Sequence, residues 1–527
     1  MKDIITTGKT ALGIELGSTR VKAVLIDENC KVIASGAHDW ENKLENGYWT
    51  YSLEDVQTAV HSCFKALKAD VKEKYGCDFT TTGAIGISAM MHGYLAFNKR
   101  GELLTPFRTW RNTTTAEAAE YLTEKLCFNI PQRWTCSHIY QAILNKEDHV
   151  SEIAYVTTLA GYVHYMLTGV NAVGVGEASG IFPVDSATND YDEKMMVTYD
   201  GLLKEKGFGK SLRDILPKVL VAGENAGCLT EKGVKFLDES GEFSVGVPFA
   251  PCEGDAGTGM TATNSVKERT GNISAGTSIF AMVVLEKNLT KVYPEIDMVT
   301  TPTGKPVAMV HCNNCTSDIN AWAGLFGEFA DALGIKTSRG KILDLMFENA
   351  MKGDRDCGGL VSYNYFSGEP VTGLQQGRPL FVRTPDAAFT LGNFMRVQLY
   401  SALAALKVGL DLLLKNEKAE IDKIYGHGGF YIYPGVGQKI TAAAIDAPVS
   451  VMKTAGEGGP YGMALLALYS VMGEGMTLED FLQTKAFADA ETVTVSPDKN
   501  DVEGFNIFLD RYVKGLETEK AATQSIN

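Results

Sequence analysis

Two short turns in the chain carry the small and hydroxyl-bearing residues that bind phosphate groups. The first lies in ALGIELGSTRVKAVLID, which begins at Ala11, and the second lies in NISAGTSIFAMVVL, which begins at Asn272. Tight turns of small residues expose backbone N–H groups to anions, and Ser and Thr hydroxyls add further donors. The residues of the two turns are Gly17, Ser18 and Thr19, then Gly276, Thr277 and Ser278. We expect the two turns to hold one polyphosphate from both sides.

Two acids stand where such a site would need them. Glu15 ends the apolar run before the first turn, and an acid at a strand end suits Mg²⁺, which favours carboxylates, water and substrate phosphates. Asp255 lies in EGDAG, where glycines permit close approach of the backbone to a ligand. A carboxylate that accepts the proton of a reacting hydroxyl contributes typically ~10²–10⁴-fold in rate. The alternative for Asp255 is a structural cap of the following helix.

Other familiar motifs are absent or incomplete. GKT at Gly8 and GKS at Gly209 lack the upstream glycine of a P-loop, and no G-x-S-x-G nucleophile elbow occurs. GTGMTA at 257–262 resembles a dinucleotide-binding turn, so an oxidoreductase remains an alternative, although a hairpin follows where a crossover helix is expected. Cys312 and Cys315 form a single CxxC without a second pair, which favours ordinary thiols over a metal or redox site.

The elements that position these residues follow from the apolar patterning. Each turn joins two strand-like runs, and the two hairpins lie 276 − 17 = 259 positions apart, which predicts two similar domains. We expect a third strand over 31–39, a helix over 52–75 capped by Ser52, and a buried strand over 83–88. In the second half, 390–415 is apolar through much of its length and predicts a core helix.

Length and composition limit the class of protein. With 527 residues the chain exceeds the roughly 250–300 residues of a single core, so two domains are expected. The net charge of -15 disfavours a nucleic-acid partner. No apolar run approaches a membrane span, the first residues show no signal peptide, and ten scattered cysteines suit a reducing compartment, so we expect a cytoplasmic protein without a membrane partner.

Several blocks, taken in order, resemble one family. GIELGSTRVKAVLID resembles the first phosphate motif of the actin-like and hexokinase-like ATPases, and EGDAGTGMTATNSVKERTGNISAGTS resembles the second phosphate region of the FGGY carbohydrate kinases. SYNYFSGEP and GHGGFYIYPGVGQKITAAAIDAPV are similar to later segments of that family, the second of them to its adenosine loop. Within the family, ISAMMHG is most similar to xylulokinases, where a Met-His pair contacts the sugar.

The resemblance implies a role for each candidate residue. Asp255 would be the catalytic base and, with Glu15, lie at the Mg²⁺ ion. A core histidine bonded to a backbone carbonyl is the alternative for the histidine of the Met-His pair. The sugar would be bound by Met91, His92, Gly93, Trp110, Asn112 and Asp255, and ATP by Lys22, the two turns, Gly428 and Gly429.

Three positions depart from the family pattern. Glu15 replaces an Asp, which puts the metal geometry in doubt, and Phe430 replaces a small residue after the glycines of the adenosine loop. Asn112 stands where an Asp is expected; an amide donates as well as accepts, and a polar site built for one hydroxyl pattern discriminates against another. The sequence therefore leaves the identity of the sugar undecided.

The sequence as a whole predicts an α/β protein of two ribonuclease H-like, actin-like domains with a cleft between them. The predicted domains are residues 1–250 and 251–527. An alternative for about the last 45 residues is that they pack back on the first domain. The predicted function is ATP-dependent phosphorylation of a small sugar or polyol, first a ketopentose such as xylulose, with closure that excludes water. Alternatives are another ketose or polyol, such as ribulose or an erythritol-like substrate, and a nucleotide-dependent sensor or ATPase on the same fold. A homodimer is implied by the resemblance alone.

Overall fold

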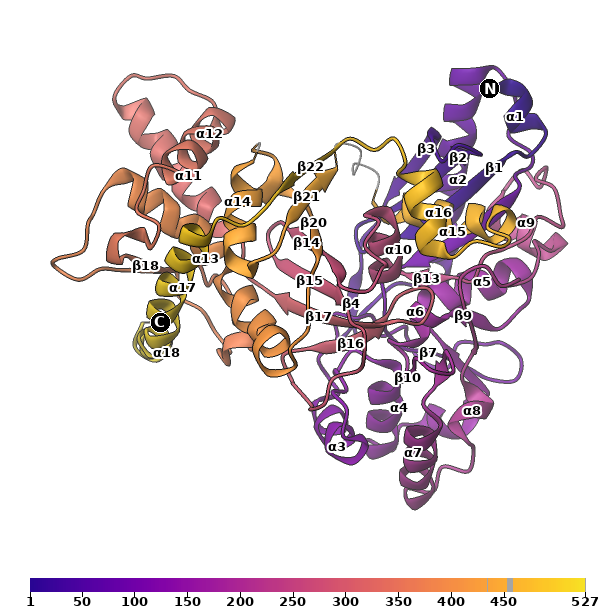
Figure 1. Cartoon of the computed structure of the whole chain (residues 1–527). Helices are drawn as coiled ribbons and strands as arrows, with labels where there is room; N and C mark the ends of the chain where they lie inside the picture. The colour runs from indigo at the N-terminus through magenta and orange to yellow at the C-terminus, as the bar shows by residue number, and fades with distance from the viewer. Residues whose placement is uncertain (434, 453–457, 527) are drawn as a thin grey trace. The chain divides into compact units, whose positions relative to one another are not determined.

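The computed structural model describes residues 1–433, 435–452 and 458–526, and it divides the chain into two compact units (Figure 1). Unit 1 comprises Met1–Lys267, Asp297–Val307 and Thr454–Ala490, and unit 2 comprises Glu268–Ile296, Ala308–Lys453 and Glu491–Asn527. Both units are mixed α/β, which confirms the predicted fold class.

The division differs from a single cut after residue 250. Helix α15 (Gly459–Met472) belongs to unit 1 because it packs on β1 (Thr10–Leu16), so closely that a Cβ on Gly13 would overlap the backbone of Pro460 and Ala464. Figure 1 accordingly shows the late α15 and α16 (Leu478–Phe481) beside the earliest strands. Residues 491–527 belong to unit 2, and only 454–490 return to the first unit.

Unit 1 is built on a five-stranded sheet with the order β13-β6-β1-β2-β3. The strands β1, β2 and β3 form an antiparallel meander, while β6 and β13 run parallel to β1. Besides β1, the strands of unit 1, inside and outside this sheet, are β2 Arg20–Asp27, β3 Val32–Asp39, β4 Lys43–Glu45, β5 Tyr48–Thr50, β6 Ala84–Ala89, β7 Leu95–Phe97, β8 Tyr155–Thr157, β9 Ala172–Gly174, β10 Val184–Asp185, β11 Asp190–Tyr191, β12 Lys218–Leu220, β13 Glu253–Gly254 and β16 Asp297–Thr300.

Helices cover this sheet and close a core of apolar side chains from β1, β2, β6 and α2. The N-cap of α2 is Ser52, whose side chain accepts from the N–H of Asp55, as the sequence predicted. The helices of unit 1, besides α15 and α16, are α1 Lys2–Thr6, α2 Leu53–Tyr75, α3 Ala116–Leu126, α4 Thr135–Leu144, η1 Asp148–Glu152, α5 Leu159–Thr168, α6 Val175–Ala178, α7 Glu193–Glu205, α8 Leu212–Ile215, α9 Glu231–Leu237, α10 Asp255–Ala262 and η6 Leu482–Ala486.

Unit 2 repeats the same sheet topology. Its strands lie in the order β17-β15-β14-β20-β21-β22, where β14 pairs antiparallel with β15 and parallel with β20. The antiparallel pair β15-β14, followed by the parallel strands β20 and β21, corresponds to β2-β1-β6-β13 of unit 1, which confirms the predicted internal repeat. The strands are β14 Thr270–Ala275, β15 Ile279–Val284, β17 Pro306–Cys312, β18 Val361–Tyr363, β19 Leu380–Val382, β20 Lys423–His427, β21 Val449–Met452 and β22 Thr492–Val495.

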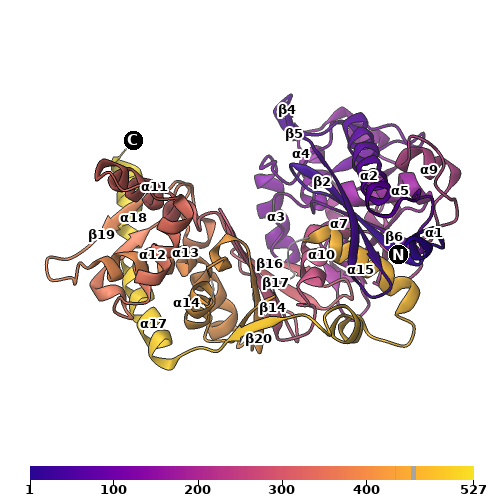
Figure 2. The ribbon, with the colours of Figure 1, turned by 90° about the horizontal axis from the view of Figure 1, so that it is seen from above.

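The helices of unit 2 gather around α13, which Figure 2 shows among α11, α12 and α14. They are α11 Ser317–Ala332, α12 Arg339–Ala350, η2 Cys357–Gly359, η3 Pro370–Thr372, α13 Leu391–Asp411, η4 Leu412–Asn416, η5 Gly429–Tyr431, α14 Val436–Ile445, α17 Lys499–Lys514 and α18 Leu516–Ser525. Contrary to the sequence analysis, one stretch, Leu391–Asn416, is long and apolar enough to cross a membrane, with a mean hydropathy of 1.5. Because 78% of an 18-residue window within it is buried inside the protein, it serves as the predicted core helix.

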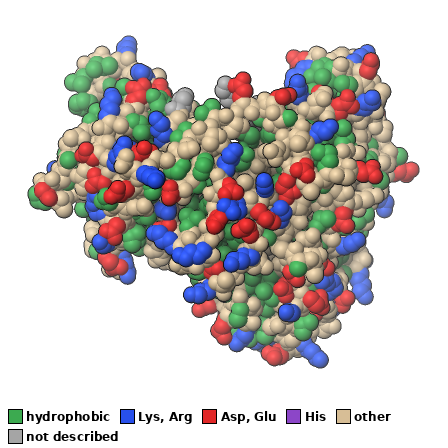
Figure 3. All heavy atoms as spheres, viewed as in Figure 1, with side chains coloured by type: hydrophobic (Ala, Val, Ile, Leu, Met, Phe, Trp, Pro, Cys, Tyr) green, Lys and Arg blue, Asp and Glu red, His purple; other side chains and the backbone are tan. Residues whose placement is uncertain are grey.

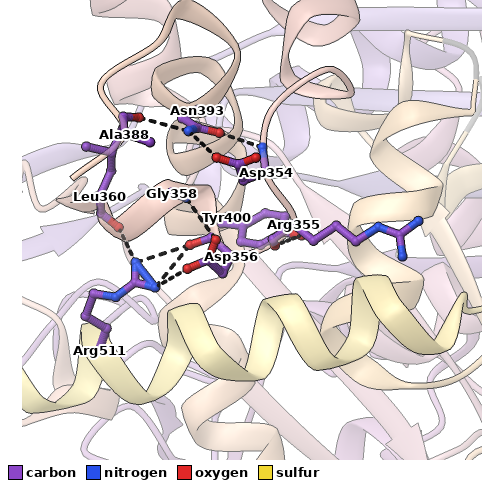
Figure 4. A network of polar contacts seen from close by, with 9 residues as sticks. All are labelled: Asp354, Arg355, Asp356, Gly358, Leu360, Ala388, Asn393, Tyr400 and Arg511. Atoms are coloured by element: carbon purple, nitrogen blue, oxygen red, sulfur yellow. Dashed lines mark hydrogen bonds and ion pairs between the residues drawn. The ribbon is translucent and has the colours of Figure 1, made fainter. Parts of the chain in front are cut away.

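The C-terminal helix α17 is fastened to the loop before β18 by polar contacts (Figure 4). Arg511 donates to the Asp356 carboxylate at 2.8 Å and to the Leu360 carbonyl at 3.3 Å. Tyr400 of α13 donates to the Arg355 carbonyl at 3.0 Å from the other side. These contacts explain why the chain end belongs to unit 2.

Candidate active site

The first predicted phosphate turn joins β1 to β2, and aromatic donors hold its carbonyl groups. The indole Nε1 of Trp40 donates to the Gly17 carbonyl at 2.7 Å, and the Tyr51 hydroxyl donates to the Ser18 carbonyl at 2.6 Å. The Trp40 backbone N–H donates to the Thr19 carbonyl at 3.1 Å. In a trans peptide the N–H of the next residue points opposite to the carbonyl, so the N–H groups of Ser18 and Thr19 are directed away from these aromatic rings. That arrangement suits an anion-binding turn.

The strand register brings the two candidate acids to one edge of the sheet. Glu15 pairs with Ser88 of β6, and Ser88 pairs with Glu253 of β13, one position before the end of that strand. Asp255 follows directly as the first residue of α10. Because the carboxyl ends of parallel strands meet at one edge, both acids lie where α/β proteins bind ligands.

The two acids affect each other electrostatically. Burial first, and the negative charge of Asp255 second, raise the pKa of Glu15 to about 7, although Lys22, opposite Glu15 in the β-ladder, acts to lower it. The Glu15 carboxylate also lies at the start of α15, where a Cβ on Gly459 would come within 2.5 Å of Oε1. A glycine at this position therefore leaves the space that the longer acid needs.

Asp255 is held by backbone groups while water still reaches it. The Met91 N–H donates to Asp255 Oδ1 at 3.2 Å. The residue is exposed to solvent. Even so, the protein around the carboxyl group removes part of its hydration, and this desolvation raises the pKa of Asp255. Backbone N–H groups and the charge of Arg133 act in the opposite direction and lower that pKa. An accessible carboxylate with restricted hydration is what a proton acceptor for a bound hydroxyl requires.

The predicted sugar-binding pair follows β6 at the same edge. His92 is buried, has a positive φ of 73°, and places Nδ1 3.4 Å from the Gly180 carbonyl. Burial first and Arg133 second hold its pKa well below 6.5, so the imidazole is neutral. Gly93 has a φ of 99°, and a Cβ there would meet the Arg108 carbonyl oxygen at 2.7 Å. The structure thus supplies the backbone carbonyl of the core-histidine alternative, and sugar binding by His92 stays a prediction.

The structure gives Trp110 and Asn112 partners within the protein. Trp110 is 42% exposed, and its indole N–H donates to the Ser18 hydroxyl at 3.0 Å. The buried Asn112 accepts from the Trp49 N–H at 2.8 Å and donates to the carbonyls of Trp49 at 2.9 Å and Thr109 at 3.0 Å. Its amide thereby fastens one backbone segment to another, and its predicted sugar contact remains a prediction.

In unit 2 the second phosphate turn and the predicted adenosine loop follow adjacent parallel strands. Ser274 of β14 pairs with His427 of β20, so the turn after Ala275 and the loop at Gly428 lie at one edge of that sheet. They touch: Gly428 has φ 99° and ψ 179°, and a Cβ there would come within 2.5 Å of the Ala275 carbonyl oxygen. Phe430 is fully buried and packs on Phe347, so its side chain fills the core of unit 2.

Arg133 is a site residue that sequence reasoning missed. Its guanidinium pairs with Asp297, and its charge acts on both His92 and Asp255. Arg133, His92 and Asp255 come from segments far apart in the chain. The local sequence PQRW carries no motif that would single Arg133 out.

Metal ligands are sparse in the part of the chain that the structure describes, where no group of three or more His, Cys, Asp or Glu side chains could hold an ion. A divalent ion at Glu15 and Asp255 would thus need further oxygens from phosphates and water. Cys312 and Cys315 are buried free thiols, and desolvation raises the pKa of each, which agrees with ordinary thiols.

Known proteins match both units. The model of the N-terminal domain of the FGGY family of carbohydrate kinases matches residues 10–261, and that of the C-terminal domain matches residues 271–471. The chain is 23% identical over 532 residues to the xylulose kinase of Haemophilus influenzae, covering 96% of this chain and 99% of that relative.

Two solved structures from Lactobacillus acidophilus share the fold. A ligand-bound xylulose kinase has a TM-score of 0.78 at 18% identity, covering 98% of this chain and 99% of the other. A gluconate kinase has a TM-score of 0.77 at 17% identity, covering 98% of each. Because kinases named for different substrates match almost equally well, the likeness shows the fold and leaves the sugar open. Since the two domain models follow each other in order over nearly all of residues 10–471, the chain belongs to the FGGY family of carbohydrate kinases.

Proposed function

We propose that the protein transfers the terminal phosphoryl group of ATP to a hydroxyl of a small sugar, first of all a ketopentose such as xylulose. The observation that carries the proposal is the placement of Glu15 and Asp255 at one edge of the unit 1 sheet, beside the first phosphate turn. Phosphoryl transfer depends on positioning, charge neutralisation and a proton acceptor, and this edge offers groups for each.

Asp255 is the group that takes the proton of the sugar hydroxyl. Its carboxylate is accessible, is oriented by the Met91 N–H, and lies within the electrostatic reach of Arg133. Arg133 adds a positive charge that favours anionic groups at the site. Met91 and His92, which follow β6, and the exposed ring of Trp110 are the proposed contacts of the sugar.

The nucleotide is bound by the turns and loops that follow the parallel strands. The N–H groups of Ser18 and Thr19, with Lys22 on β2, are proposed for the phosphates in unit 1. In unit 2 the Gly276–Ser278 turn takes phosphate and Gly428-Gly429 border the adenosine.

Mg²⁺ fits the two carboxylates of unit 1. Desolvation raises the pKa of each carboxyl group, and the negative charge of Asp255 adds to the rise at Glu15, so a cation would relieve an unfavourable pair. When bound, the ion would neutralise charge on the phosphates. Glu15 and Asp255 would hold it, with water and phosphate oxygens completing the shell.

The choice of xylulose rests on the relatives. A relative matched over nearly the whole chain is a xylulose kinase, and Met91-His92 resembles the Met-His pair of xylulokinases. Ribulose, an erythritol-like polyol or another ketose is the alternative, because identity to the relatives is low. A sensor or ATPase on the same fold is the other alternative, and it would turn over ATP without a sugar.

The first experiment is ADP release with Mg²⁺ and ATP across a panel of ketoses, aldoses and polyols. The proposal expects release that depends on one sugar, and mass spectrometry should find that sugar's monophosphate. Equal ADP release with and without every sugar would overturn it in favour of the ATPase.

We also propose a cytoplasmic enzyme, in keeping with its ten free cysteines, that binds neither nucleic acid nor membrane. Light scattering tests the homodimer implied by the family resemblance.

The surface agrees with a small-molecule enzyme. On the face shown in Figure 3, acidic and basic side chains are interspersed, and the chain carries a net charge of -15. Nucleic-acid binding instead requires clustered positive charge.

A further inference from the structure

A buried acid in unit 2 is bonded to the segment that follows β17. Glu369 is 0% exposed, and its Oε2 accepts from the Asn314 backbone N–H at 3.3 Å and from Asn314 Nδ2 at 3.1 Å. Two hydrogen bonds from one residue to a buried carboxyl oxygen, away from competing water, hold Asn314 in one orientation.

The side chain of Asn314 is bonded along the same segment. Its Oδ1 accepts from the N–H groups of Phe366 at 3.0 Å and Ser367 at 3.1 Å, while Nδ2 donates to the Ser367 carbonyl at 3.3 Å. Asn314 is 3% exposed, so these bonds are shielded from water. The segment 366–369 and Asn314 therefore form one rigid unit, which we call the brace.

The residues directly after Asn314 hold the second phosphate turn. The Cys315 N–H donates to the Thr277 carbonyl at 2.9 Å. Thr316 donates twice to the Gly276 carbonyl, from its N–H at 3.0 Å and from its hydroxyl at 2.7 Å. Asn364, just before the brace, donates to the Cys315 carbonyl at 3.0 Å.

These bonds determine the direction of the turn's donors. With the carbonyls of Gly276 and Thr277 held toward Cys315 and Thr316, the N–H groups of Thr277 and Ser278 point the opposite way. In unit 1 the carbonyl groups of the first turn are instead held by the aromatic donors Trp40 and Tyr51. The two turns are therefore oriented by different kinds of side chain.

We propose that Glu369, acting through Asn314, is a positioning residue that orients the Gly276–Ser278 turn for the phosphates of the nucleotide. The inference rests on the proposed function, because it assumes that this turn binds nucleotide phosphate. A donor array fixed before binding costs no reorganisation when the ligand arrives. Loosening the brace should therefore weaken nucleotide binding and leave sugar binding unchanged.

The test is titration calorimetry of the full-length protein with Mg-ADP, a readout that needs no turnover. Glu369→Ala and Asn314→Ala should weaken ADP binding by about tenfold or more, as expected when a buried hydrogen bond is lost and its partner is left unsatisfied. Glu369→Gln should keep most of the affinity, because its amide oxygen still accepts from Asn314. The KM for ATP should rise in parallel, with the KM for the sugar unchanged.

A matched pair guards against variants that fail to fold. Thr316→Val removes only the hydroxyl that donates to Gly276, while Thr290→Val removes a hydroxyl of the same unit that bonds to Glu417 at 2.9 Å instead of to the turn or the brace. We expect weaker ADP binding in the first and wild-type binding in the second.

The outcomes separate this inference from the proposed function. Wild-type protein that binds no ADP would overturn both. Wild-type protein that binds ADP, with Thr316→Val and every folded brace variant binding equally well, would overturn the brace alone. Equal changes in the KM values for ATP and sugar would also contradict it, because they would indicate general loosening.

Discussion

Replacing Gly428 by alanine should disrupt the proposed nucleotide-binding region of unit 2. The residue has φ 99° and ψ 179°, a combination reached essentially by glycine alone, and holding another residue there costs about 1–3 kcal/mol. A Cβ would also lie 2.5 Å from the Ala275 carbonyl oxygen and 2.9 Å from its carbon, closer than real Cβ atoms approach backbone. Because Ala275 immediately precedes the second phosphate turn, relieving this contact must move that turn.

The matched control is the neighbouring Gly429→Ala. Gly429 has no positive φ, and a Cβ there meets nothing within 4 Å, so its effect on stability should stay within about 0.5 kcal/mol. We expect Gly428→Ala to lower the thermal midpoint by several degrees, since about 1 kcal/mol corresponds to ~2–4 °C in a domain of 150–250 residues. Midpoints are compared directly, because a chain with two units need not unfold in one step.

Calorimetry with Mg-ADP completes the test. Gly428→Ala should bind ADP about tenfold or more weakly, equivalent to roughly 1.4 kcal/mol of lost binding free energy. A variant with the thermal midpoint and ADP affinity of the wild type would refute the reasoning, since neither the backbone strain nor the contact with Ala275 would then matter.

Three further predictions concern unit 1 and the thiols. Gly462→Ala should lower the thermal midpoint, because a Cβ would overlap a backbone carbonyl of α10, whereas Gly259→Ala on α10 itself meets nothing within 4 Å and should leave it unchanged; equal midpoints would contradict the close packing of α10 on α15. Asn112→Asp should cost about 1–3 kcal/mol, because a carboxylate cannot donate to the two carbonyls that the amide now satisfies, and urea denaturation that finds no loss would show that those bonds are dispensable. Only Cys127 and Cys228 are exposed, and burial raises the pKa of most other thiols, so a thiol reagent should label two cysteines quickly in the native protein; fast labelling of a third would show that a buried site opens.

Local sequence patterns were enough to predict the elements that carry the chemistry. The two hairpins, the helix capped by Ser52 and the buried strand before Met91 were all placed within a few residues, because their signals are short-range periodicity and turn composition. The internal repeat was also visible, since both turns keep a glycine followed by two hydroxyl residues.

Contacts between distant segments could not be predicted in the same way. The return of 454–490 to unit 1 depends on the packing of α15 against Gly13, and nothing in either segment alone indicates the other. Arg133 joins the site through the three-dimensional fold, and Asn112, expected at the sugar, has its amide bonded to the backbone of Trp49 and Thr109.

The helix α13 also shows what sequence composition alone cannot decide. Its composition alone would allow a membrane span, and only its burial in unit 2 decides in favour of a core helix. Hydropathy along a single helix reports that an environment is apolar without saying whether protein or lipid supplies it.

The most direct test of the account is the sugar-dependent rate of ADP formation in Asp255→Asn, measured beside calorimetric titrations of sugar and Mg-ADP with the same variant. The account predicts that both ligands still bind and that the rate falls by about 10²–10⁴-fold, because an amide cannot accept the proton of the hydroxyl. A variant that binds both ligands and turns over at the wild-type rate would contradict the assignment of Asp255 as the base.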